Sequence, residues 1–94
     1  MVRARILLFA TLRDKYGVRE LEVKCDGTVR NLIENTAKAV LDKGFLGHVY
    51  DVGRNKVRDD LIFSINGRNI KDIKEQIKIK EGDTVAIFPP LAGG

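Results

Sequence analysis

The sequence has 94 residues, which is enough for one domain and leaves no room for a second independent core. Its 44% hydrophobic and 32% charged residues are typical of a folded domain and exclude a disordered chain. The net charge of +4 comes from 17 basic residues scattered among 13 acidic ones, with 6% aromatic residues and no Trp, so the composition does not favour a nucleic-acid-binding protein.

The amino-terminal part of the chain predicts a β-hairpin. Residues 2–10 alternate in polarity, and residues 19–25 alternate again. A turn over residues 14–17 would join these two strands. On the first strand the residues of one parity are expected to face the core, and they are Ala4, Ile6, Leu8 and Ala10.

One amphipathic helix is predicted after the hairpin. Thr28 is a suitable helix N-cap, and Gly44 suits the left-handed residue that ends a helix. Between them, residues spaced three and four apart form one stripe on the helix. This stripe consists of Val29, Leu32, Ile33, Thr36, Ala37, Val40 and Leu41.

The second half of the chain predicts shorter elements. Apolar residues within 45–52 could cover an edge of the core as a short helix, and residues 53–60 predict an exposed loop. The later elements are a strand over 61–65, a tight turn at Asn66-Gly67, a short strand or irregular segment over 69–79, and a last strand over 84–88. Pro89-Pro90 ends the last strand, because proline cannot donate a ladder hydrogen bond.

A helix between hairpins buries its apolar stripe against one face of a sheet. If the first and last strands lie side by side at the centre of that sheet, they run parallel. The order of elements therefore predicts an α+β fold, the ubiquitin-like β-grasp, with a mixed sheet packed on one main helix. We expect this domain to span residues 1–90 and to carry a flexible Gly-Gly tail over residues 91–94.

The tail is the candidate for chemistry. Gly93 and Gly94 have no side chains and could thread a channel too narrow for any other residue. The Gly94 α-carboxylate, with an ordinary pKa of about 3.5, is ionised at neutral pH. With Mg²⁺ and positioning supplied by an enzyme, it could attack the α-phosphate of ATP, and a sulfur or nitrogen nucleophile could then attack the adenylate. The alternative is a frayed chain end without function.

Strand parity also predicts an apolar surface beside the tail. Leu7 and Phe9 point away from the core side on the first strand, as Ala86 and Phe88 do on the last. If these strands are neighbours, the four side chains form a patch on the open sheet face, which is typical of a partner-binding surface. The alternative is that residues 45–52 fold over this patch and cover it.

Other reactive residues favour structural roles. Cys25 is the only cysteine, so an internal disulfide is excluded, and its inward parity predicts an inert buried thiol. His48 is expected at the surface or in packing, and no metal site is expected. No apolar stretch approaches the roughly 20 residues that span a bilayer, and no cleavage site follows the short apolar start. We expect a cytoplasmic protein whose partners are neither membranes nor nucleic acids.

Four segments resemble the MoaD family, the small subunits of molybdopterin synthase. They are residues 6–13, residues 27–32, the hairpin at Asn66-Gly67-Arg68 with the strand before it and, most specifically, residues 82–94, which include Phe88-Pro89-Pro90 and the Gly-Gly end. Residues 43–60 are longer than in compact members and resemble the longer archaeal-type version. The thiamine sulfur carrier ThiS matches less well, particularly at Phe88-Pro89-Pro90.

The resemblance implies a sulfur carrier without an active site or bound cofactor of its own. A ubiquitin-activating-type enzyme of the MoeB/ThiF kind would adenylate Gly94 with ATP and Mg, and a sulfur donor would convert it to a thiocarboxylate. A MoaE-like large synthase subunit would then receive the tail and transfer the sulfur to the pterin. Phe9, Arg13 and Phe88 match the family's interface positions. The partner-binding residues implied are Leu7, Phe9, Arg13, Ala86, Phe88, Pro89, Pro90, Leu91 and Ala92.

Other functions are also compatible with this sequence. Members of this family also serve as small archaeal protein modifiers joined to lysines through the same Gly-Gly end. A thiamine-type sulfur carrier and a β-grasp binding module that does not use its tail are the others.

Overall fold

The structure is a computed structural model that describes residues 1–89. Its strands are β1 (Val2–Leu8), β2 (Glu20–Cys25), β3 (Tyr50–Asp51), β4 (Lys56–Val57), β5 (Ile62–Ile65), β6 (Arg68–Asn69) and β7 (Thr84–Phe88). Its helices are α1 (Ala10–Tyr16), α2 (Val29–Ala39), α3 (Gly44–Val49) and the short 3₁₀ helix η1 (Ile70–Asp72).

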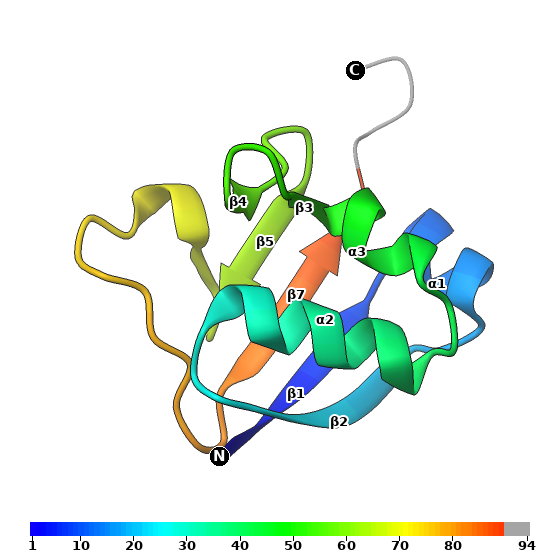
Figure 1. Cartoon of the computed structure of the whole chain (residues 1–94), viewed down its shortest axis with the longest axis horizontal. Helices are drawn as coiled ribbons and strands as arrows, with labels where there is room; N and C mark the ends of the chain where they lie inside the picture. Colours follow the sequence, from blue (N-terminus) through cyan, green and yellow to red (C-terminus); the bar gives the residue numbers. More distant parts are fainter. Residues whose placement is uncertain (90–94) are drawn as a thin grey trace.

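One mixed sheet with a helix across it forms the fold (Figure 1). The strand order is β2-β1-β7-β5-β6, with β1 and β7 parallel in the middle and the other neighbours antiparallel. Helix α2 crosses one face of this sheet, and the opposite face is left open (Figure 1). The predicted α+β β-grasp arrangement, including the parallel central pair, is therefore confirmed.

The core lies between α2 and the sheet, and strand parity places its residues as predicted at most positions. On β1 the buried residues are Ala4, Ile6 and Leu8, and on β7 they are Val85 and Ile87. Ala10, which was expected to share the inward parity, is exposed. The reason is that β1 ends at Leu8 and the backbone at Ala10 turns to a φ of 52°, which begins α1.

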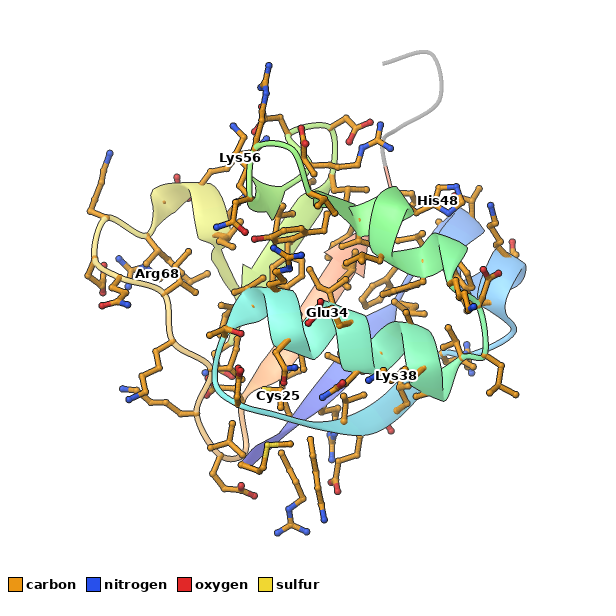
Figure 2. All side chains as sticks on the ribbon, in the orientation of Figure 1. Cys25, Glu34, Lys38, His48, Lys56 and Arg68 are labelled. Atoms are coloured by element: carbon orange, nitrogen blue, oxygen red, sulfur yellow. The ribbon has the colours of Figure 1, made fainter. Side chains whose placement is uncertain are left out.

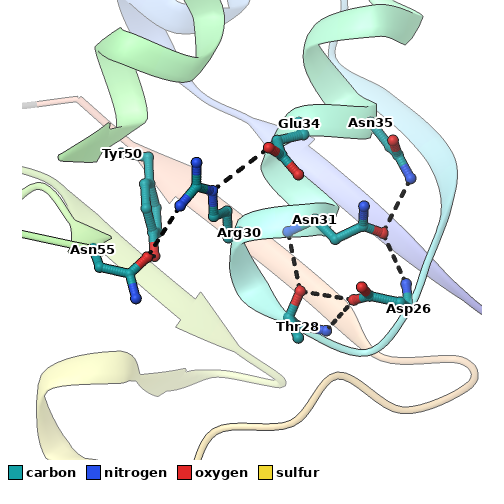
Figure 3. A network of polar contacts seen from close by, with 8 residues as sticks. All are labelled: Asp26, Thr28, Arg30, Asn31, Glu34, Asn35, Tyr50 and Asn55. Carbon is teal, nitrogen blue, oxygen red and sulfur yellow. Dashed lines mark hydrogen bonds and ion pairs between the residues drawn. The ribbon is translucent and has the colours of Figure 1, made fainter. Parts of the chain in front are cut away.

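Helix α2 begins at a polar cap that ties it to the end of β2 (Figure 3). The Thr28 hydroxyl accepts from the Asn31 N–H at 3.1 Å, as the predicted N-cap requires. Asp26 accepts in turn from the Thr28 hydroxyl and N–H, which lowers the pKa of its carboxyl. The Asn35 side chain donates to the Lys24 carbonyl oxygen at 2.8 Å. These bonds fix the crossing of α2 over the sheet.

The predicted end of α2 at Gly44 is wrong. The helix ends at Ala39, and the next turn closes with bonds from the Leu41 N–H to Lys38 and from the Asp42 N–H to Ala37. This is the Schellman arrangement, with Leu41 at the left-handed position, φ 57°, that glycine usually occupies. Leu41 is 91% exposed, so its predicted place on the buried stripe is also wrong. Gly44 instead begins α3, its N–H bonded to the Asp42 carboxylate.

Leu41 gives a testable prediction about stability. A non-glycine residue in the left-handed conformation costs about 1–2 kcal/mol, and asparagine tolerates this conformation better than leucine does. We expect Leu41→Asn to raise the free energy of unfolding by about 0.5–1 kcal/mol. Leu41→Ala is the control, since it removes the apolar surface without easing the backbone. Urea unfolding checks this, and equal effects of the two variants would contradict it.

Elsewhere the structure adds a helix and a small second sheet that the sequence pattern did not predict. The predicted turn over 14–17 is the end of helix α1, with Gly17 as its left-handed C-cap. The loop predicted over 53–60 contains β4, which pairs with β3 in a small second sheet. The predicted tight turn at Asn66-Gly67 is confirmed, because both residues have positive φ and join β5 to β6.

Candidate functional site

The parallel central strands bring two aromatic rings together where β7 ends. Phe9 is the residue before α1, and its N–H donates to the Ile87 carbonyl oxygen at 3.3 Å. Its ring stacks on that of Phe88, with 4.3 Å between ring centroids and 9° between ring planes. Such a pair contributes about 0.5–1.5 kcal/mol beyond the burial of its area. Phe9 and Phe88 therefore form a fixed platform at the end of the last strand.

Strand register extends this platform across three strands. Leu7 on β1 is opposite Ala86 on β7, and Phe88 is opposite Ile62 on β5. Ile62 is 47% exposed and Phe88 is 36% exposed, while the others are half-buried. We call these side chains the apolar patch, and its members are Leu7, Phe9, Ile62, Ala86 and Phe88. The sequence predicted that four of these side chains, all except Ile62, lie next to one another, and the structure confirms this. Their role in binding a partner stays a prediction.

Sequence reasoning missed Ile62, although a pattern for it was present. The buried Phe63 and Ile65 alternate with Ile62, which therefore faces the open side of the sheet. The alternation of residues does not show which strand pairs with β5. Only the antiparallel pairing of β5 with β7 places Ile62 beside Phe88.

The other half of the open face is charged. The Arg3 side chain pairs with Glu81 at 3.1 Å, and Arg5 pairs with Glu20 at 3.6 Å. Along β1 the outward side chains thus change from charged at the amino end to apolar at the carboxyl end. A well-packed aromatic centre with polar surroundings is typical of an interface in which a few residues carry the affinity.

Residues 45–52 do not cover the apolar patch. Phe45, Val49 and Tyr50 belong to the buried core cluster. Helix α3 lies on the same side of the sheet as α2, away from the open face (Figure 1). The alternative in which this segment hides the patch is therefore wrong. The prediction that it covers an edge of the core as a short helix is confirmed.

The remaining predicted partner-binding residues fall into two groups. Arg13 lies on α1, half-buried, with its side chain 3.6 Å from Asp14 and its N–H bonded to the Phe9 carbonyl oxygen. Pro89 directly follows the patch and is half-buried. The others, Pro90, Leu91 and Ala92, lie outside the described residues, so the structure does not place them. The same holds for Gly93 and Gly94, which were predicted as the reacting end of the chain.

A second cluster, formed by His48 with Lys15 and Tyr16, joins α1 to α3. The His48 Nε2 lies 3.1 Å from the Lys15 ammonium, and its Nδ1 lies 2.6 Å from the Tyr16 hydroxyl. An ammonium can only donate, so Nε2 accepts and Nδ1 carries the hydrogen. Burial and, secondly, Asp42 raise the pKa of Tyr16. Figure 2 shows His48 at the end of the molecule where β7 ends.

This second cluster lies at the edge of a cavity beside the platform. The cavity has a volume of about 340 Å³. It is lined by Thr11, Leu12, Lys15, His48, Arg58, Asp60, Leu61 and Pro89. The sequence did not predict it, because its walls come from four segments far apart in the chain.

Cys25 is fully buried, as its parity predicted, and burial raises the pKa of its thiol. The thiolate is the reactive form, so this residue is not a candidate nucleophile. Within residues 1–89, no group of three His, Cys, Asp or Glu side chains is placed to hold a metal ion. No helix in that range is long and apolar enough to cross a membrane.

The ThiS family matches residues 6–94. The molybdopterin synthase sulfur carrier subunit of Drosophila melanogaster is 36% identical over 94 residues, which is 100% of this chain and 93% of that protein.

Two solved structures share the fold. A putative molybdopterin converting factor, subunit 1, from Pyrococcus furiosus is 31% identical, with a TM-score of 0.64 over 97% of this chain and 100% of that one. The protein SAMP1 from Haloferax volcanii is 26% identical, with a TM-score of 0.73 over 98% of this chain and 99% of that one.

Proposed function

Because this chain belongs to the ThiS family, we propose that it is a sulfur carrier and the small subunit of a molybdopterin synthase. Full-length similarity to the Drosophila melanogaster sulfur carrier subunit and to the Pyrococcus furiosus protein supports this assignment. The observation that carries it in the structure is the stacked Phe9–Phe88 platform. This platform offers a partner an aromatic anchor immediately before the tail.

In this proposal the reacting group is the Gly94 carboxylate. A MoeB/ThiF-like enzyme binds ATP and Mg, and a carboxylate oxygen attacks the α-phosphorus while pyrophosphate leaves. Sulfide-level sulfur from a donor then attacks the acyl carbon, AMP and a proton leave, and a thiocarboxylate remains on Gly94. The side-chain-free Gly93-Gly94 end lets the acyl group enter a narrow pocket. The chain itself supplies position and an acyl group, and the activating enzyme supplies catalysis.

Transfer of the sulfur requires docking on a larger subunit. We propose that a MoaE-like synthase subunit covers the apolar patch and receives the tail, so that the thiocarboxylate reaches the pterin in the larger subunit's active site. Half-buried and exposed apolar side chains on an open sheet face support a surface that a partner desolvates. The charged half of this face then forms part of the rim.

A second candidate function is covalent protein modification through Gly94. Similarity to SAMP1 of Haloferax volcanii, a small archaeal modifier protein by name, favours it. An adenylated Gly94 attacked by a lysine amine instead of sulfur would give an isopeptide bond and release AMP. Both functions use the same activation step, so one chain can have both. The thiamine-type sulfur carrier is the remaining alternative, and it differs in the acceptor of the sulfur.

Two measurements on protein from its native host test the proposal. The sulfur-carrier function predicts an intact mass in which sulfur replaces one oxygen, and co-purification of a defined complex with the large synthase subunit. The modifier function predicts tryptic peptides of other proteins in which a lysine carries the carboxyl-terminal peptide of this chain, residues 81–94, because Lys80 is the last tryptic site before Gly94. A native pool with an unchanged mass, no synthase complex and abundant lysines that carry this peptide would reject the carrier function in favour of the modifier.

A further inference from the structure

The cavity beside Pro89 contains a cation for which residues 1–89 supply no ion-pair partner. Arg58 donates to Asp60 at 2.9 Å, which leaves this pair locally neutral. Within residues 1–89, no carboxylate lies within ion-pair distance of Lys15, and its ammonium contacts the His48 ring. One uncompensated positive charge therefore lies at the edge of a concave surface.

The Lys15 ammonium is held in place before any ligand arrives. His48 accepts one of its hydrogens at 3.1 Å, and the Tyr16 ring lies beneath it, 5.9 Å from nitrogen to ring centroid. An ammonium has three hydrogens to donate, so two are left for a ligand. Since a lysine side chain normally loses considerable rotamer entropy on pairing, this restraint lowers the cost of binding a carboxylate.

The floor of the cavity is apolar. Leu12 and Leu61 are only 6% and 4% exposed, and Pro89 forms the wall where β7 ends. A short aliphatic stem on this floor would place an anionic group next to Lys15. Glutamate and aspartate have this shape, with methylene carbons behind a carboxylate that accepts charge-assisted hydrogen bonds.

We propose that this cavity receives an acidic side chain of the protein that takes up the tail. This inference rests on the proposed function and specifies the chemistry of its partner. The cavity wall at Pro89 directly follows Phe88, so the acidic contact would continue the interface formed by the apolar patch. The net charge of +4 on the chain also favours an acidic partner surface. The partner thus places a glutamate or aspartate side chain in the cavity, on the side of Pro89 where α1 and α3 meet.

The test measures the affinity of the full-length chain for the large synthase subunit from the same organism, by calorimetry at low and high salt. We expect Lys15→Gln to weaken binding about tenfold and to flatten the salt dependence, because one charge-assisted contact is lost. Lys15→Glu should weaken it further through like-charge repulsion. Lys15→Arg, which keeps the charge, should retain most of the affinity.

Lys38→Glu is the matched control. It makes the same charge change at an exposed lysine on α2 and should leave the affinity within about twofold of the wild type. If the wild-type chain does not bind the large subunit, the proposed function fails. If the wild type binds, and both Lys15→Gln and Lys15→Glu keep the affinity of Lys38→Glu, the proposed acidic contact at Lys15 fails and the proposed function stands.

A further measurement distinguishes the partner's acid from the chain's own Gly94 carboxylate. Side-chain NMR resonances of Lys15 are compared between the full chain and a full-length chain whose Gly94 carboxylate is amidated. Unchanged resonances in the free proteins, with a shift on adding the large subunit, support the proposal. A shift on amidation alone would mean that the Gly94 carboxylate occupies the cavity, and this would overturn the proposal.

Discussion

Deletion of Gly94 is expected to abolish sulfur transfer while leaving the folded domain intact. The deletion moves the terminal carboxylate back by about 3.5 Å, the length of one extended residue. A misplacement of about 1 Å from the reacting geometry already costs about a hundredfold in rate. Synthase reconstituted with the shortened chain should therefore lose at least about a hundredfold of its activity. Molybdopterin formation, with intact mass as a measure of thiocarboxylate loading, checks this expectation.

Two controls make the deletion informative. A chain that lacks Ala92 has the same length as the Gly94 deletion but keeps the Gly-Gly end. If reach alone matters, both variants fail equally, and if the identity of the last residues also matters, the Ala92 deletion retains more loading. Thermal unfolding should be unchanged in both. Normal activity of the chain without Gly94 would contradict the proposed function itself.

Phe88→Asp is expected to disrupt docking on the larger subunit. The substitution removes the stack with Phe9 and places a carboxylate at the centre of the apolar patch, where the partner would bury it unpaired. Aromatic anchors at an interface centre typically account for about 2–4 kcal/mol, so we expect the affinity for the large subunit to fall by more than about thirtyfold. Calorimetry on the purified subunits measures this.

Phe88→Leu and Val52→Asp are the comparison variants. Phe88→Leu keeps an apolar side chain without the ring and should give an intermediate loss of affinity. Val52 is 48% exposed in the turn between β3 and β4, outside the apolar patch, so Val52→Asp should bind normally. Equal binding by Phe88→Asp and Val52→Asp would exclude the patch as the docking surface.

Much of this fold was predictable because its core residues follow simple periods. Alternation predicted β1, β2 and β7, and the spacing of apolar residues predicted α2 from its cap at Thr28. The end of α2 was not predictable in the same way. Leu41 continues the apolar period, yet backbone hydrogen bonds to Lys38 and Ala37 turn the chain there. The unfavourable left-handed conformation of Leu41 therefore follows from the complete structure and not from the local sequence pattern.

The candidate site was partly predictable for a related reason. Parity placed Phe9 and Phe88 on one face, and the parallel central pairing followed from the order of elements. Ile62 and the cavity beside Lys15 depend on which segments become neighbours in space, which local patterns do not specify. Helix α1 is short and buries only Leu12, so it has no apolar period to reveal it.

The central position of β7 has a mechanical consequence. A partner that pulls on the end of the chain applies its force along the axis of β7. This strand is bonded to β1 on one side and to β5 on the other. The hydrogen bonds run across the strands, so the load would be shared by both ladders in shear and would not open them one bond at a time. The domain would therefore resist traction applied to its carboxyl-terminal end.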